Sequence, residues 1–303
     1  MLPTVVFKYI LYNIMSKKID LTYLNEVEKL GKDTIINKFG SWTSRIDELK
    51  SSFIHGVPFE HIVIDNFLSD DYAEEIHNLF PTNYESWYTY TNPLEVKFAY
   101  DNINVLNVNL KNYFYYLSSA PMIDLMKEIT TIGNLEMDEY LHGAGLHSHP
   151  KHGRLNVHLD YEKHPISGKE RRINIIYFST KNWDPLWNGA NELWDKNVTA
   201  CVKKTDVMFN RAILFKTNEI SWHGLHEKIT CPDNIFRKSL AYYYVSDLDI
   251  AKPESSYRKK AKFVKTPKDS YSEKMEQLYK IRENRLITPD DLEEIMPKWR
   301  MED

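Results

Sequence analysis

The sequence is poor in cysteine and lacks both a long apolar run and an excess of positive charge. Only Cys201 and Cys231 occur among 303 residues, and their spacing is not that of a metal site. A disulfide-stabilised secreted scaffold is therefore disfavoured, and we expect a reduced, cytoplasmic protein. No transmembrane helix is predicted, so we expect no membrane partner. The net charge of -4 gives no overall attraction to nucleic acid, which we also do not expect as a partner.

The composition is that of a folded globular protein without internal repeats. Hydrophobic residues make up 42% of the chain and aromatic residues 13%, which argues against disorder. The first fifteen residues are apolar but lack a cleavage site. We expect them to form a packed segment, or to reflect an upstream start codon with Met15 as the alternative start.

Apolar periodicity predicts helices towards both ends of the chain. They are expected over residues 20–40, 69–81, 121–133, 269–286 and 288–296. Asp20, Ser69 and Thr288 are the expected N-caps. The predicted organisation is an N-terminal helical extension (1–57), a central domain (58–250) and a C-terminal helical extension (251–303).

The central region reads as a series of short strands. Segments rich in Val, Ile, Tyr and Phe alternate with Pro, Gly, Asn and Asp turns, which is typical of an antiparallel sandwich or barrel. Strands are predicted within residues 59–68, 154–161, 171–180, 191–195, 211–218, 221–226 and 237–246.

The stretch "NVHLDY" places two metal-binding residue types on one strand. Alternate side chains of a strand share a face, so Asn156, His158 and Asp160 are expected to point the same way. A third ligand would be needed, and His223 in "SWHGLH" is the best candidate. Two histidines and one carboxylate form the facial triad of non-haem iron(II) oxygenases. A structural hydrogen-bonded pair is the alternative for His158 and Asp160.

A carboxylate-binding residue follows on a later strand. In "RKSLAYYY", Arg237 and Ser239 share one face, and arginine can form a bidentate pair with a carboxylate. This would hold the distal carboxylate of a keto diacid whose other end chelates iron. The alternative for Arg237 is a surface charge at a strand end.

Taken in order, these segments resemble the iron(II)/2-oxoglutarate-dependent dioxygenases, specifically their prolyl 4-hydroxylase-like branch. The resemblance runs from "PFEHIVIDNFL" to "RKSLAYYYVS", about two-thirds of the chain, and includes "GAGLHSHPKHGRLNVHLDYEKHP" and "FNRAILFKTNEISWHG". It implies a mainly β fold with flanking helices around a double-stranded β-helix (jelly-roll, cupin-like) core. It also implies Fe(II), with 2-oxoglutarate and O2 as cosubstrates, and leaves a need for ascorbate open.

The resemblance assigns roles to individual residues. The iron ligands that it implies are His158, Asp160 and His223. The cosubstrate residues that it implies are Arg237, Ser239, Tyr140 and Asn174. Two further residues are tentative substrate contacts, Asn156 and Trp222, although a tryptophan here is more often part of the core or rim. One departure is "WNGANELW", where the family usually has Trp-Gly-Gly; we expect it to reshape a rim loop without touching a ligand.

Two other clusters have less specific patterns. His142, His147, His149 and His152 could suggest a second metal, but we expect a long loop over residues 142–154 at the mouth of the site. His226 is expected to face away from His223. The basic run "RKKAKFVK" (258–265) is expected to be a solvated linker, with an acidic partner or substrate as the alternative.

The resemblance makes an active hydroxylase of a prolyl residue in a protein or peptide the leading hypothesis. The same chemistry on a free amino acid, a peptide natural product or a glycan-linked small molecule is the first alternative. A non-catalytic cupin-like binding module is the second, and Arg237 argues against it because such a module needs no carboxylate anchor. A homodimer formed through the terminal helices is left open.

Overall fold

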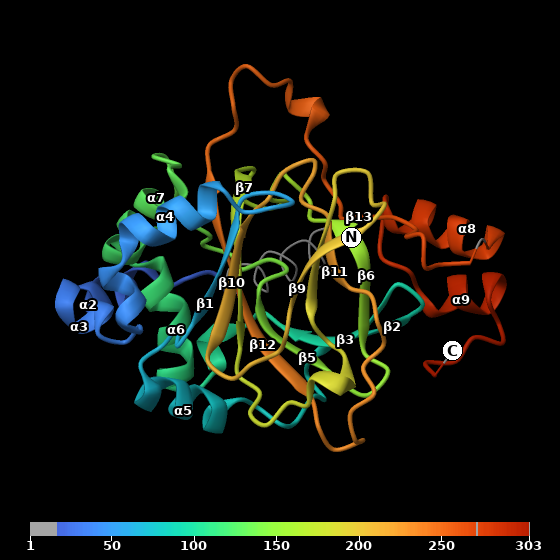
Figure 1. Ribbon diagram of the computed structural model, residues 1–303, viewed down its shortest axis with the longest axis horizontal. Coiled ribbons are helices and arrows are strands. Elements are labelled where there is room, and N and C mark those ends of the chain that lie inside the picture. The colour runs from blue at the N-terminus through green and yellow to red at the C-terminus, as the bar shows by residue number, and fades with distance from the viewer. Residues whose placement is uncertain (1–16, 271, 303) are drawn as a thin grey trace, which may run out of the picture.

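The computed structural model describes residues 17–270 and 272–302, and shows an antiparallel β-barrel flanked by helices (Figure 1). The expectation for the first fifteen residues lies outside the described part of the chain. Neighbouring strands of the main path follow the order β1-β10-β7-β12-β5-β3-β6-β11-β8-β9. Short strands β2, β4 and β13 pair with β3, β12 and β6 respectively. This architecture confirms the predicted mainly β, jelly-roll fold class.

The elements that the following sections use have these bounds. The helices are α2 (Leu21–Glu28), α3 (Lys32–Ile36), α4 (Ile46–Ile54), α5 (Asp70–Leu79), α6 (Val108–Ser118), α7 (Ala120–Thr130), α8 (Glu273–Arg282) and α9 (Pro289–Ile295). The strands are β1 (His61–Asp65), β2 (Tyr88–Asn92), β3 (Glu95–Tyr100), β4 (Glu136–Met137), β5 (Gly145–His149), β6 (Arg154–Leu159), β7 (Glu170–Phe178), β8 (Asn191–Trp194), β9 (Cys201–Thr205), β10 (Arg211–Lys216), β11 (His223–Leu225), β12 (Arg237–Ser246) and β13 (Lys262–Phe263).

Strands β7 and β12 separate the hydrophobic core from the interior of the barrel. Ile173, Ile175 and Tyr177 of β7 join the core that the N-terminal helices cover, on the left of Figure 1. Asn174 and Ile176, which alternate with them, line the interior cavity. Full burial of such large apolar side chains stabilises the fold by roughly 1.5–3 kcal/mol each. The apolar face therefore fixes the sheet against the helices and leaves the polar face free for a site.

The predicted helix over residues 20–40 is wrong as a single element. Asp20 does cap α2, because its carboxylate accepts hydrogen bonds from the backbone N–H groups of Thr22 and Tyr23. The helix then stops, and α3 begins after Gly31, whose φ of 86° lies outside the helical region. Leu24, Val27 and Ile35 nevertheless pack into the same core as the barrel.

The C-terminal helices lie on the opposite flank, at the right of Figure 1. Leu278 and Tyr279 of α8 form a cluster with Leu94 and Phe263. Thr288 caps α9 in a capping box with Asp291, as the sequence predicts. Within the described residues, no helix has the length and apolar character that crossing a membrane requires.

Two segments that the sequence analysis treats as irregular are strands. Residues 145–149 form β5, which pairs with β12 and β3, so the expected long loop over 142–154 is wrong for this part. Lys262 and Phe263 form β13, which pairs with β6 opposite Leu159 and His158. The run 258–265 is therefore not a solvated linker, since it adds a strand beside the segment that contains His158.

Candidate active site

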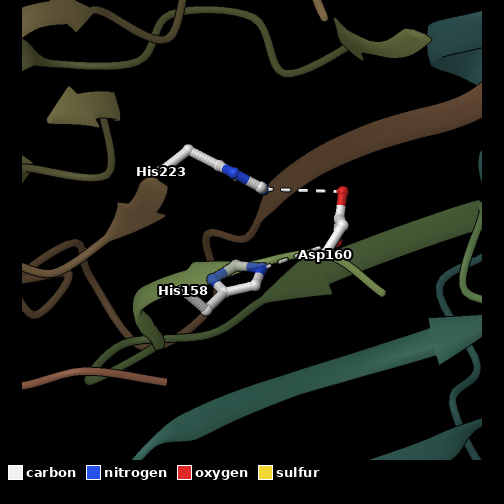
Figure 2. Close-up of side chains that lie close together, drawn as sticks. All are labelled: His158, Asp160 and His223. Atoms are coloured by element: carbon white, nitrogen blue, oxygen red, sulfur yellow. Dashed lines mark ion pairs between the residues drawn. The ribbon is translucent and has the colours of Figure 1, made fainter. Parts of the chain in front are cut away.

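His158, Asp160 and His223 converge from two neighbouring strands (Figure 2). β6 and β11 are antiparallel, and His158 lies directly opposite His223. One ligand atom from each of the three residues lies within 4.8 Å of the others. The Nε2 atoms of His158 and His223 lie 3.7 Å and 3.8 Å from the two carboxylate oxygens of Asp160. All three residues are buried.

The two imidazoles are oriented by their other nitrogen. Nδ1 of His158 lies 2.9 Å from the carbonyl oxygen of Asn156, and Nδ1 of His223 lies 2.9 Å from that of Ser221. A hydrogen bond donated to a carbonyl keeps the proton on Nδ1 and leaves the lone pair of Nε2 towards the common point. This is the arrangement that metal-binding histidines require, so the donor set fits a divalent transition metal ion.

The carboxylate of Asp160 is held in its ionised form. Its Oδ2 atom accepts hydrogen bonds from Asn174 Nδ2 at 3.1 Å and from the Tyr243 hydroxyl at 3.2 Å. Burial alone would raise the pKa of Asp160, but hydrogen bonding with His158 and the nearby His223 and Arg171 hold it below its usual range. Burial and the adjacent His158 lower the pKa of His223 to about 4. Near neutral pH the site therefore presents an ionised Asp160 carboxylate and a neutral His223 imidazole.

Aromatic rings fix the histidine planes. Phe263 of β13 stacks on His158 with ring centroids 5.0 Å apart and planes at 20°. Phe215 packs against His223 with centroids 4.7 Å apart. The C-terminal segment thus packs directly against the candidate metal ligands, which sequence reasoning missed because β13 is only two residues long.

Arg237 lies in the same cavity, which has a volume of about 700 Å³. Its Nε donates to the carbonyl oxygen of Gly189 at 2.7 Å, and Nη1 lies 3.5 Å from the Ser239 hydroxyl. Burial lowers the pKa of Arg237 to about 9, and no carboxylate of the described residues pairs with it. Asn174 Oδ1 also has no hydrogen-bond partner there. The buried guanidinium of Arg237 fits a carboxylate of a small ligand. The free Oδ1 atom of Asn174 fits a hydrogen-bond donor of the same ligand.

The turn that departs from the family pattern supports this arginine. Gly189 has a φ of 88° and accepts the Arg237 hydrogen bond through its carbonyl. A Cβ at this position would lie 3.3 Å from Cδ of Arg237 and 3.1 Å from the ring of Trp183. The turn is therefore part of the Arg237 environment, a contact that the expectation of a reshaped rim loop does not include.

The remaining predicted residues divide into two groups. Tyr140, Asn174 and Ser239 line the cavity. Asn156 does not; it lies in a separate cleft formed with α8 and with residues that follow α9. From the pair His158–His223 to the pair Leu155–Leu225, β6 advances by three residues and β11 by two. This register shift places Leu155 on the cavity side in place of Asn156.

Trp222 is also absent from the cavity lining. It packs with Val157, Leu159 and Trp194 in a small hydrophobic cluster and is 8% exposed. Because it directly precedes His223, its side chain points to the other face of the strand.

His226 faces away from the triad, as predicted, and forms an ion pair with Asp269 at 2.9 Å. His147 and His149 line the cavity from β5, and the described residues contain one group of three potential metal ligands, the triad.

A second buried guanidinium escaped the sequence analysis. Arg171 is 1% exposed and lies between the rings of Tyr161 and Tyr243, with Cζ 3.5 Å and 3.6 Å from their centroids. It donates to the carbonyl oxygen of His142 and to the Tyr161 hydroxyl. Tyr243 in turn contacts Asp160, so this stack braces the carboxylate of the triad.

Comparison with known proteins identifies this arrangement. Residues 144–245 match the family model of the 2OG-Fe(II) oxygenase superfamily. This part of the chain is a 2OG-Fe(II) oxygenase domain. The matched segment contains the His-Asp-His triad and Arg237, so the protein is a 2-oxoglutarate- and Fe(II)-dependent dioxygenase that uses O2. No curated protein matches the sequence.

The dioxygenase shares its fold with a solved prolyl hydroxylase. The structure of a Trichoplax adhaerens prolyl hydroxylase, in complex with a hypoxia inducible factor oxygen degradation domain peptide fragment, aligns with a TM-score of 0.50 and 15% identity. The alignment covers 70% of this chain and 96% of that one. A Pseudomonas putida prolyl-4-hydroxylase aligns with a TM-score of 0.45 and 12% identity, over 68% of this chain and 99% of the other.

Proposed function

We propose that the dioxygenase holds Fe(II) through His158, Asp160 and His223 and hydroxylates a prolyl residue of a protein or peptide. The observation that carries the metal assignment is the pair of Nε2 atoms facing Asp160, each with its Nδ1 bound to a backbone carbonyl. When bound, the iron and 2-oxoglutarate supply the oxidising chemistry, in which O2 and 2-oxoglutarate give succinate, CO2 and a hydroxylated C–H position.

The protein's own residues position the reactants. Arg237 and Ser239 would hold the distal carboxylate of 2-oxoglutarate, because the guanidinium is buried and otherwise unpaired by a carboxylate in the described chain. Asn174 and Tyr243 keep Asp160 oriented by donating hydrogen bonds to one of its oxygens. Tyr140 lines the same cavity.

The cavity also limits access of water to the reacting groups. Its walls near the triad include the aromatic rings of Phe263 and Tyr243. A protected site is needed because the oxidant would otherwise react with the protein or with solvent. Arg237 separates this proposal from a simple cupin-like binding module, which needs no carboxylate anchor beside its metal.

The prolyl substrate is supported by the fold shared with a prolyl hydroxylase that was solved with a peptide fragment. The test is mass spectrometry after incubation with Fe(II), 2-oxoglutarate and air, across a panel of proline peptides and free amino acids. We expect a product that has gained one oxygen atom on proline, with succinate formed in equal amount. Efficient coupling on another class, with no product from any prolyl substrate, would contradict this substrate assignment and favour the free amino acid alternative.

A further inference from the structure

The cavity carries more positive charge than the proposed reaction uses. Its described lining contains seven lysine or arginine side chains and three carboxylates. Lys17 pairs with Asp101 at 2.8 Å, and Arg282 pairs with Glu95 at 2.9 Å. The third carboxylate, Asp160, belongs to the triad. The charges of Fe(II) and of the 2-oxoglutarate dianion offset each other, so cosubstrate binding leaves this excess in place.

This excess of positive charge in the cavity occurs in a chain whose net charge is negative. Arg237 is assigned to 2-oxoglutarate and Arg171 is held between two tyrosine rings, which leaves Lys97, Lys259 and Lys260. The whole sequence has a formal net charge of -4, so these lysines form a local feature and do not reflect the overall composition. A cleft lined by one sign of charge concentrates ligands of the opposite sign.

Lys97 is the innermost of the three lysines. It extends from β3 into the cavity, and its side chain is 13% exposed. Its nearest carboxylate is Glu95, with Oε2 at 3.8 Å, and the same carboxylate already accepts the hydrogen bond from Arg282. One carboxylate therefore serves two cations. Burial lowers the pKa of Lys97, and the opposing effects of Glu95 and Asp160 do not restore it. An additional anion would complete this cluster.

Lys259 and Lys260 stand at the mouth of the cavity and are exposed. The segment that carries them is fixed on both sides. Arg258 donates through Nε to the carbonyl oxygen of Asp160 at 2.7 Å and through its backbone N–H to Glu162 at 2.8 Å. After Lys260 the chain enters β13, which pairs with β6. The basic run is thus held against the site.

We propose that the primary substrate presents a carboxylate, which Lys97 binds inside the cavity and which Lys259 and Lys260 attract at its mouth. This inference rests on the proposed function and adds a substrate class to it. The carboxylate is distinct from that of 2-oxoglutarate, because β5 lies between β12, which carries Arg237, and β3, which carries Lys97, so the two cations extend from strands about 10 Å apart. An acidic residue near the target proline and the free carboxylate of an amino acid are the two sources of this group.

The experiment uses matched pairs of compounds that differ by one carboxylate. Proline peptides with Glu or Gln beside the proline form one arm, and free proline and prolinamide form the other. The readout is kcat/KM for substrate-dependent succinate formation, expressed as the ratio of the acid to its amide. We expect a ratio of about tenfold or more for the wild-type protein in at least one arm, as a charge-assisted hydrogen bond gives. The arm that shows it identifies the source.

Three variants locate the effect. Lys97→Gln should bring the ratio close to one, and Lys259→Gln combined with Lys260→Gln should lower it severalfold and weaken its dependence on salt. The double variant changes only exposed side chains, so it carries the test if Lys97→Gln does not fold. Lys29→Gln, at the exposed C-cap of α2 and paired with Glu26, is the matched control and should keep the wild-type ratio.

The outcomes separate this inference from the function on which it rests. If the wild-type protein forms no succinate from 2-oxoglutarate with Fe(II), the proposed function fails. If it forms succinate but the acid and amide members of every pair are used equally, or neither member of any pair is used, the carboxylate proposal is overturned. A high wild-type ratio that Lys97→Gln and the double variant both retain also overturns it.

Discussion

Arg237 combines near-complete burial with the lack of a carboxylate partner among the described residues. A charge-assisted hydrogen bond from its guanidinium to a ligand carboxylate would contribute about 1.5–3 kcal/mol. We predict that Arg237→Gln raises the KM for 2-oxoglutarate by about 10–100-fold, with a smaller effect on kcat. Succinate formation measured against 2-oxoglutarate concentration gives both constants. Arg45→Gln, which alters an exposed pair with Glu48, is the control; an unchanged KM in Arg237→Gln would refute the anchor role.

At the residue scale, alternation along single strands predicted the cavity-facing positions only while the strand stayed regular. It placed His158 with Asp160, and Arg237 with Ser239, correctly in one cavity. It failed for Asn156, because the register shift between β6 and β11 breaks the period of two. Lys97 and Arg171 carried no signal, since their proximity to the triad depends on how distant strands pair.

At the scale of elements, β13 links the C-terminal segment to the metal site. Phe263 is 3% exposed and covers one face of the His158 ring. We predict that Phe263→Ala lowers the free energy of unfolding by about 3–5 kcal/mol and weakens Fe(II) binding, because the imidazole loses its packing partner. Urea unfolding and Fe(II) titration measure the two effects.

A matched control keeps this prediction specific. Ile250→Ala removes an apolar side chain that is fully exposed, and should change stability by less than about 0.5 kcal/mol. If Phe263→Ala binds Fe(II) as tightly as the wild-type protein, the strand would have a purely structural role. The sequence could not predict β13 or β5, because a charged run and a Gly-Leu-His-Ser-His segment lack the apolar alternation of the other strands.

At the scale of the whole molecule, buried histidines make stability depend on pH. Burial lowers the pKa of His223 from 6.5 to about 4 and that of His149 well below 6.5. Below pH 6.5 the unfolded chain binds protons on these residues that the folded protein does not bind. The free energy of unfolding therefore falls as the pH falls from 6.5 towards 4. We predict a loss of about 1 kcal/mol for each histidine at roughly one pH unit below 6.5.

Urea unfolding of the metal-free protein at neutral and mildly acidic pH measures this loss. His149→Asn should reduce the pH dependence, whereas His55→Asn, at an exposed position after α4, should leave it unchanged. A stability that stays constant over this interval would contradict the assignment of neutral, buried imidazoles.

The overall architecture was more predictable than its connections. The order of strand-like segments and the family resemblance predicted the barrel, and the strands predicted after residue 150 are present. The pairing of β3 with both β5 and β6 could not be read from local patterns, because it joins segments that are about fifty to sixty residues apart in the chain. The overall charge likewise gave no indication of the cationic cavity.

The central claim is that His158, Asp160 and His223 form the iron-binding centre of a 2-oxoglutarate-dependent dioxygenase, and the most direct test is succinate formation under air. Purified protein with Fe(II) and 2-oxoglutarate should form succinate slowly even without a primary substrate, and removal of Fe(II) should stop it. His158→Ala should lower the rate by at least about 100-fold, in line with the loss of a metal ligand and its chemistry. His55→Ala should keep the wild-type rate. Succinate formation by His158→Ala at the wild-type rate would contradict the account.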